Sequence, residues 1–196
     1  MIYILAGLAL WTVSHAFKRM FTQMAEVMGQ SRKGIVSLGS IIAIVLMVIG
    51  YRSVNSEPFW QPAGWVIAIN NVLMLISLYF FAASGAKTRL SLVVRHPMLN
   101  GMMIWAVAHI IVNGDIESFL LFGGLFFWAM VTKRVIDNND PWMIPNPAPI
   151  GKEIGVAVTT LVVYLGLLHA HGLLGPWPLW SGWPVDGPLS VIFTPF

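Results

Sequence analysis

The stretch TRLSLVVRHPMLNGMMIWAVAHIIVNGD, from Thr88 to Asp115, decides how the chain folds. It starts with basic residues, and from Pro97 to Val112 it becomes an apolar run that contains one histidine, His109. Proline suits the first position of a helix, where its missing N–H would have no partner. We therefore predict that Pro97 opens a membrane helix with His96 just outside it. An imidazole within an apolar span needs a partner, so His109 is a candidate functional residue.

Composition indicates a membrane protein. Of 196 residues, 57% are hydrophobic and 10% are charged, and the mean hydropathy is +0.77. A soluble domain is about 25% charged. The chain has no cysteine, which excludes disulfides, thiolate ligands, cysteine nucleophiles and c-type haem attachment. The net charge of +3 comes from basic residues beside apolar segments. We expect membrane lipids as partners and no nucleic acid.

Six apolar segments are candidates to cross a bilayer, which takes roughly 17–25 residues. They cover residues 2–17, 35–51, 65–83, 97–112, 116–132 and 154–171. The first segment has no basic region before it and no small-residue cleavage site, so we expect it to be retained. The prediction is an all-α, polytopic bundle of about six transmembrane helices over residues 1–175.

The last residues, 176–196, are predicted to form an irregular tail. The segment after Gly172 contains five prolines and three tryptophans. Proline at this density prevents a seventh helix. Tryptophan favours the boundary between membrane and water, so we expect the tail at the outer membrane interface.

Basic residues give the predicted orientation. All but Arg52 of the 11 basic residues lie between spans one and two, three and four, or five and six. By the positive-inside rule these loops are cytoplasmic. Both termini are then on the non-cytoplasmic side of a multi-pass protein, in the inner membrane if the source is a Gram-negative bacterium.

Histidines are the main candidates for chemistry. His15 lies near the inner end of its span, four residues after Trp11. His109 shares a helix face with Gly101, Trp105 and Asn113. A glycine on that face lets a flat ligand or another backbone approach closely. His109 therefore has two interpretations: ligation of haem or a metal, or a hydrogen bond between helices.

Spacing limits which histidines can act together. His96 and His109 are about 20 Å apart along a helix and roughly 140° apart around it, so they cannot bind one metal. A haem held from two sides would need a histidine from another helix, and His15 is a candidate. His96 fits an N-cap or loop position, with Arg95 near lipid phosphate.

The remaining polar residues have simpler interpretations. His169 and His171 are expected at the outer interface, at a depth that could match that of His109. Asp115 and Glu117 are expected to be solvated at the outer turn. The sequence has no carboxylate pair spaced for acid–base chemistry, no phosphate loop and no HExxH motif.

Three short motifs resemble the NnrU family, which comprises bacterial membrane proteins linked to nitrite and nitric oxide reduction. They are His15 followed by Lys18-Arg19, then Arg95-His96-Pro97, then Ala108-His109 with Asn113-Gly114. The resemblance extends from about Met1 to Arg134. The family is similar to the plant 15-cis-zeta-carotene isomerase, an integral membrane protein that uses haem b. The RHP motif alone also occurs in membrane methyltransferases, so a methyltransferase is a remote alternative.

The resemblance implies haem b within the bundle. The axial ligands would be His15 and His109. The cofactor would also contact Trp105 and Gly101. The residues that orient the site would be His96, Arg95, Asn100 and Asn113. One function is cis–trans isomerisation of a carotenoid-like polyene. Another is a non-enzymatic accessory of denitrification that binds partner proteins. A third is a structural membrane subunit without a metal, whose histidines bond between helices.

Overall fold

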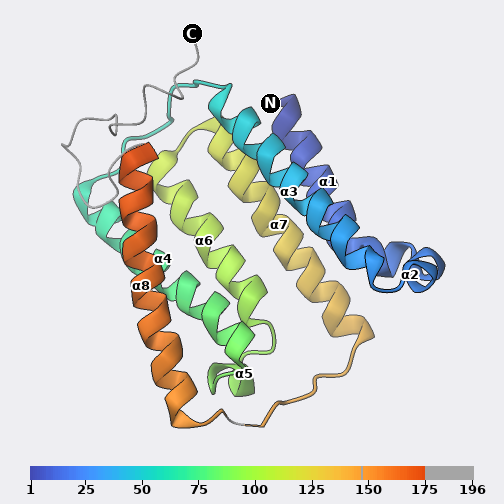
Figure 1. Ribbon diagram of the computed structural model, residues 1–196. Helices are drawn as coiled ribbons and strands as arrows, with labels where there is room; N and C mark the ends of the chain where they lie inside the picture. The colour runs from blue at the N-terminus through green and yellow to red at the C-terminus, as the bar shows by residue number, and fades with distance from the viewer. Residues whose placement is uncertain (147, 175–196) are drawn as a thin grey trace.

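Within residues 1–146 and 148–174, which the computed structural model describes, the chain folds into six long helices and two short ones (Figure 1). They are α1 (Ile2–Met20), α2 (Thr22–Met28), α3 (Ser31–Arg52), α4 (Gly64–Ala86), α5 (Leu90–Val93), α6 (Pro97–Asn113), α7 (Ile116–Asn139) and α8 (Ile150–Leu174). This part of the chain has no strand, which confirms the all-α class. The predicted tail, 176–196, lies outside the described residues.

Four helices of the described part are long and apolar enough to cross a membrane: α3, α4, α7 and α8. Helix α6 is apolar but has only 17 residues. Helix α1 has 19 residues and carries Lys18 and Arg19 in its last turn. The chain is therefore a membrane protein with a long helix in each of the six predicted segments, while the count of six spans stays a prediction.

The helix ends extend beyond the apolar segments. Helix α3 begins at Ser31, before the predicted Ile35, and α7 continues to Asn139, past the predicted Thr132. Polar residues at these ends can be solvated in the headgroup region, so the backbone stays helical where the hydrocarbon core ends. Hydropathy therefore located the apolar part of each helix and not its last residue.

Helices α1, α3 and α7 contact one another at one side of the bundle. Helix α7 also contacts α6, α6 contacts α4, and α4 contacts α8. The short helices α2 and α5 mark one end of the bundle (Figure 1). At that end the chain leaves α1, α4 and α7 and enters α3, α6 and α8. We call this the basic end, because most of the lysines and arginines lie there, in the helix ends and the connections between them.

Helices α1 and α3 approach closely because small residues lie between them. A Cβ at Gly7 would lie 2.6 Å from Met47 Cγ and 2.8 Å from the Ala43 carbonyl oxygen. A Cβ at Gly50 would lie 2.6 Å from the backbone nitrogen of Ile4. Small residues at such contacts let two membrane helices pack backbone to backbone.

Helix α6 begins at the predicted residue and ends one residue beyond the predicted segment, 97–112. Pro97 occupies the first turn, and the Asn100 N–H donates to the His96 carbonyl at 3.0 Å. Gly114 ends the helix in a left-handed conformation, with φ of 67°. A Cβ there would lie 2.8 Å from Trp60 Cε2, so glycine is required by both the backbone angle and the space.

The turn after α6 corrects one expectation. Asp115 caps α7, since its carboxylate accepts from the Ser118 N–H at 2.7 Å. Glu117, expected to be solvated, is buried, with 6% of its surface exposed. The loop after α3 folds back over the first turn of α7, and the Glu117 carboxylate accepts from the Ser56 N–H at 3.3 Å and from the Ser56 hydroxyl.

Candidate functional site

Two histidines on different helices have the same local geometry. His15 Nδ1 lies 2.9 Å from the carbonyl oxygen of Trp11, and His109 Nδ1 lies 2.9 Å from that of Trp105. A carbonyl can only accept, so Nδ1 donates its proton and Nε2 of the neutral ring keeps its lone pair. A backbone carbonyl on one ring nitrogen is the usual outer partner of a histidine that binds a metal through the other.

Aromatic rings fix the orientation of both imidazoles. The His15 ring centroid lies 4.0 Å from that of Trp11 and 5.2 Å from that of Trp128. The His109 ring is stacked on Phe122, with centroids 4.5 Å apart, and lies 4.7 Å from Trp105. Each ring is therefore held by a hydrogen bond and by aromatic contacts from its own helix and from α7.

A groove of about 370 Å³ lies beside His15, between α1 and α7. We call it the His15 groove. Its α7 wall includes Phe127, Trp128, Val131 and Ile136. Arg19 of α1 also lines the groove and forms an ion pair with Asp140 at the end of α7. Clefts that take a drug-sized ligand measure about 300–1,000 Å³, so this groove has the volume for one.

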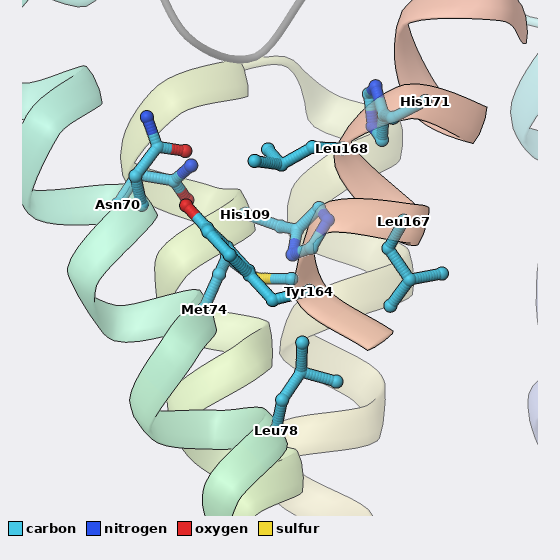
Figure 2. A pocket seen from close by; sticks show the side chains of 9 residues that line it. Asn70, Met74, Leu78, His109, Tyr164, Leu167, Leu168 and His171 are labelled. Atoms are coloured by element: carbon cyan, nitrogen blue, oxygen red, sulfur yellow. The ribbon is translucent and has the colours of Figure 1, made fainter. Parts of the chain in front are cut away.

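A smaller cavity of about 70 Å³ lies beside His109, between α4, α6 and α8. Figure 2 shows His109 between Asn70 and Met74 of α4 and Tyr164 and His171 of α8. We call it the His109 pocket. Its volume is below the range for organic ligands, but it can hold water.

The His109 pocket contains an unsatisfied polar atom. Asn70 is 9% exposed, and within the described structure its Oδ1 has no hydrogen-bond partner. Like His109 Nε2, this oxygen can only accept. The chemistry of the pocket therefore suits a small hydrogen-bond donor such as water.

The structure does not bring His15 and His109 together. They line different cavities, so joint ligation of one iron by this pair stays a prediction. His171 is the histidine that shares the pocket of His109, whereas the pocket lining does not include His169. Among the residues that are described, no three His, Cys, Asp or Glu side chains gather to hold a metal ion.

Comparison with known proteins identifies the family. The NnrU protein family model matches residues 3–178, which include both histidine sites. The chain belongs to the NnrU family. No curated protein and no solved structure matches this NnrU chain.

Two of the residues predicted to contact a cofactor have other contacts in this NnrU protein. Ser77 donates to the Gly101 carbonyl at 2.8 Å, and a Cβ at Gly101 would lie 3.1 Å from the Ser77 carbonyl oxygen. Gly101 therefore admits the backbone of α4, one of the two predicted alternatives. Trp105 contacts the rings of His109 and Phe122 and is not among the residues that line the His109 pocket.

Three of the residues predicted to orient the site lie at the basic end. Asp137 Oδ1 lies 3.0 Å from Arg95 Nη1 and 2.8 Å from His96 Nε2. The side-chain oxygen of Asn100 accepts a hydrogen bond from Lys133 at 3.3 Å. These bonds tie the start of α6 to the end of α7. Since α7 forms one wall of the His15 groove, they position that groove indirectly. The fourth, Asn113, is the last residue of α6.

Sequence reasoning on this NnrU chain named His171 but did not single out the α4 side chains or Tyr164 of the His109 pocket. One signal was present, because Asn70 and Asn71 interrupt an otherwise apolar helix. Amides within an apolar span are costly unless bonded, and so they mark a polar contact or a site. Tyr164 had no comparable signal.

Proposed function

We propose that this NnrU protein binds haem b in the His15 groove and acts through it on an apolar polyene that enters from the lipid. The proposal rests on two features that occur together at His15, the tautomer of its ring and the groove beside it. Its imidazole is held in the tautomer that leaves Nε2 free for iron, and it lines a groove large enough for a flat ligand.

The residues of the His15 groove fit haem b. His15 supplies a nitrogen ligand, and the Trp128 and Phe127 rings supply flat apolar contacts. The His109 pocket, at about 70 Å³, does not fit a macrocycle. When bound, haem b would supply an iron centre that can interact with a conjugated double bond, while the protein orients it and excludes water.

The exposure of the groove supports an apolar substrate. Phe127 is 61% exposed and Val131 is 42% exposed on α7, one of the helices able to span a membrane. Apolar side chains exposed on such a helix face lipid, so a polyene dissolved in the bilayer would reach the groove without crossing water. Isomerisation of a double bond transfers no net electrons or atoms, and therefore needs no second substrate.

The first test is the visible spectrum of the protein in mild detergent, oxidised and then reduced with dithionite. We expect a Soret band that shifts on reduction, because it reports the iron. The His15→Ala variant should lose the band, whereas the control His109→Ala should keep it.

Two results would contradict this assignment. A band that survives in His15→Ala and disappears in His109→Ala would move the ligand to the other pocket. A protein that stays colourless after haem is added would remove haem from the function.

The second test measures turnover. A cis-polyene is added in detergent under reducing conditions, and the isomers are separated by chromatography. Wild-type protein should convert cis to trans and His15→Ala should not. If haem-loaded protein converts nothing, the isomerase function is wrong, and the accessory function in denitrification becomes the one to test, by copurification of partner proteins.

A further inference from the structure

A group of cations lies where α1, α2 and α3 meet at the basic end. Lys18, Arg32 and Lys33 all line two adjoining hollows of about 230 and 350 Å³. His15 lines the smaller hollow as well as its own groove. We call the two hollows together the α2 basic pocket.

The cations of this pocket are not neutralised by the protein. Elsewhere at the basic end, Arg19 is paired with Asp140 and Arg95 with Asp137. Within the described part of the chain, Lys18, Arg32 and Lys33 form no ion pair.

The pocket lining has one acid, Glu26, and so an excess of positive charge. Like charges gathered at one place repel one another, and a bound anion relieves that repulsion. Gln30 also lines the larger hollow, and its side-chain amide can donate a hydrogen bond to an anion.

Apolar side chains next to the pocket indicate which anion. Met20, Phe21, Met24 and Val27 are 57%, 41%, 54% and 89% exposed. They belong to α2 and its N-terminal flank, between the end of α1 that carries Lys18 and the start of α3 that carries Arg32 and Lys33. Exposed apolar residues beside basic ones are typical of a segment that lies at the boundary between headgroups and acyl chains.

We propose that the α2 basic pocket binds the phosphate of an anionic phospholipid, whose acyl chains contact Phe21 and Met24. Basic pockets between helices at the cytoplasmic membrane surface are the kind of site that holds lipid phosphates. Free phosphate offers the charge but not the apolar contacts, and so a lipid is the ligand that satisfies both features.

The test compares lipids on the full chain as purified in a neutral detergent. The midpoint of thermal unfolding is measured with added phosphatidylglycerol, with phosphatidylcholine of the same acyl chains, and with inorganic phosphate. We expect only phosphatidylglycerol to raise the midpoint. Native mass spectrometry should show phosphatidylglycerol retained on the protein in preference to phosphatidylcholine.

Two triple variants locate the effect. The first variant combines Lys18→Gln, Arg32→Gln and Lys33→Gln. In this variant phosphatidylglycerol should no longer raise the midpoint of thermal unfolding. The matched control combines Lys87→Gln, Arg134→Gln and Lys152→Gln, which removes the same number of charges elsewhere at the basic end. This control variant should keep the rise in unfolding midpoint caused by phosphatidylglycerol. If the first triple variant does not fold, Arg32→Gln alone should lose retained phosphatidylglycerol in the mass spectrum.

Four results would overturn the proposal. The first is an equal rise in the unfolding midpoint with both lipids, and the second is a rise with inorganic phosphate as large as with phosphatidylglycerol. The third is that the control triple variant loses the phosphatidylglycerol effect to the same extent. The fourth is that a Soret band present in the wild type is lost in the first triple variant. The last result would assign the cations to haem propionates. A colourless wild-type protein that still responds to phosphatidylglycerol would support the lipid site while contradicting the proposed haem function.

Discussion

At the scale of single residues, the buried carboxylate of Glu117 holds the loop after α3 against α7. Replacing it with alanine would leave the Ser56 N–H without its partner and open space beside Ser118, whose hydroxyl lies 2.9 Å from that of Tyr51. We expect Glu117→Ala to lower the free energy of unfolding by about 1–3 kcal/mol, the range for an orphaned buried group. Thermal unfolding in detergent would measure it. The exposed Glu57 of the same loop is the control, and a loss as large in Glu57→Ala would show that the bonds to Ser56 do not matter.

At the scale of helices, contact between α1 and α3 depends on Gly7. A methyl group there would meet Met47 Cγ at 2.6 Å and the backbone of Ala43 at 2.8 Å, so the helices would have to move apart. Gly7→Ala is expected to destabilise by about 1–3 kcal/mol, the usual effect of overpacking. Gly34, in α3, has no atom within 4 Å of such a methyl group. Gly34→Ala should be neutral or stabilising by up to about 1 kcal/mol, because alanine favours helix. Equal midpoints of thermal unfolding for the two variants would contradict close packing at Gly7.

At the scale of the whole molecule, the basic end is predicted to face the cytoplasm. Alkaline phosphatase, which is active only outside the cytoplasm, can be fused within loop 53–63, at the opposite end, or within 140–149, at the basic end. The first fusion should be active and the second inactive, because lysine and arginine are retained on the cytoplasmic side. The reverse pattern would contradict the predicted orientation, and activity at both positions would contradict the count of six spans.

Local features of the sequence predicted much of the fold. Pro97 opens α6 and Gly114 closes it because both positions depend on backbone angles of one or two residues. The apolar segments marked where the long helices lie, since each must be apolar along its own length. The short helices α2 and α5 were not predicted, because four or seven residues give too little periodicity to detect.

The sequence by itself determined an all-α membrane chain, the position of each long helix, and His15 and His109 as the histidines to examine. Only the tertiary structure decided which residues share a cavity: His109 with Asn70 and His171, and His15 with the α7 wall. The physical reason is that a cavity depends on how each helix is rotated and shifted against its neighbours. Those positions follow from contacts between distant residues, such as Gly101 on Ser77, which no local pattern specifies.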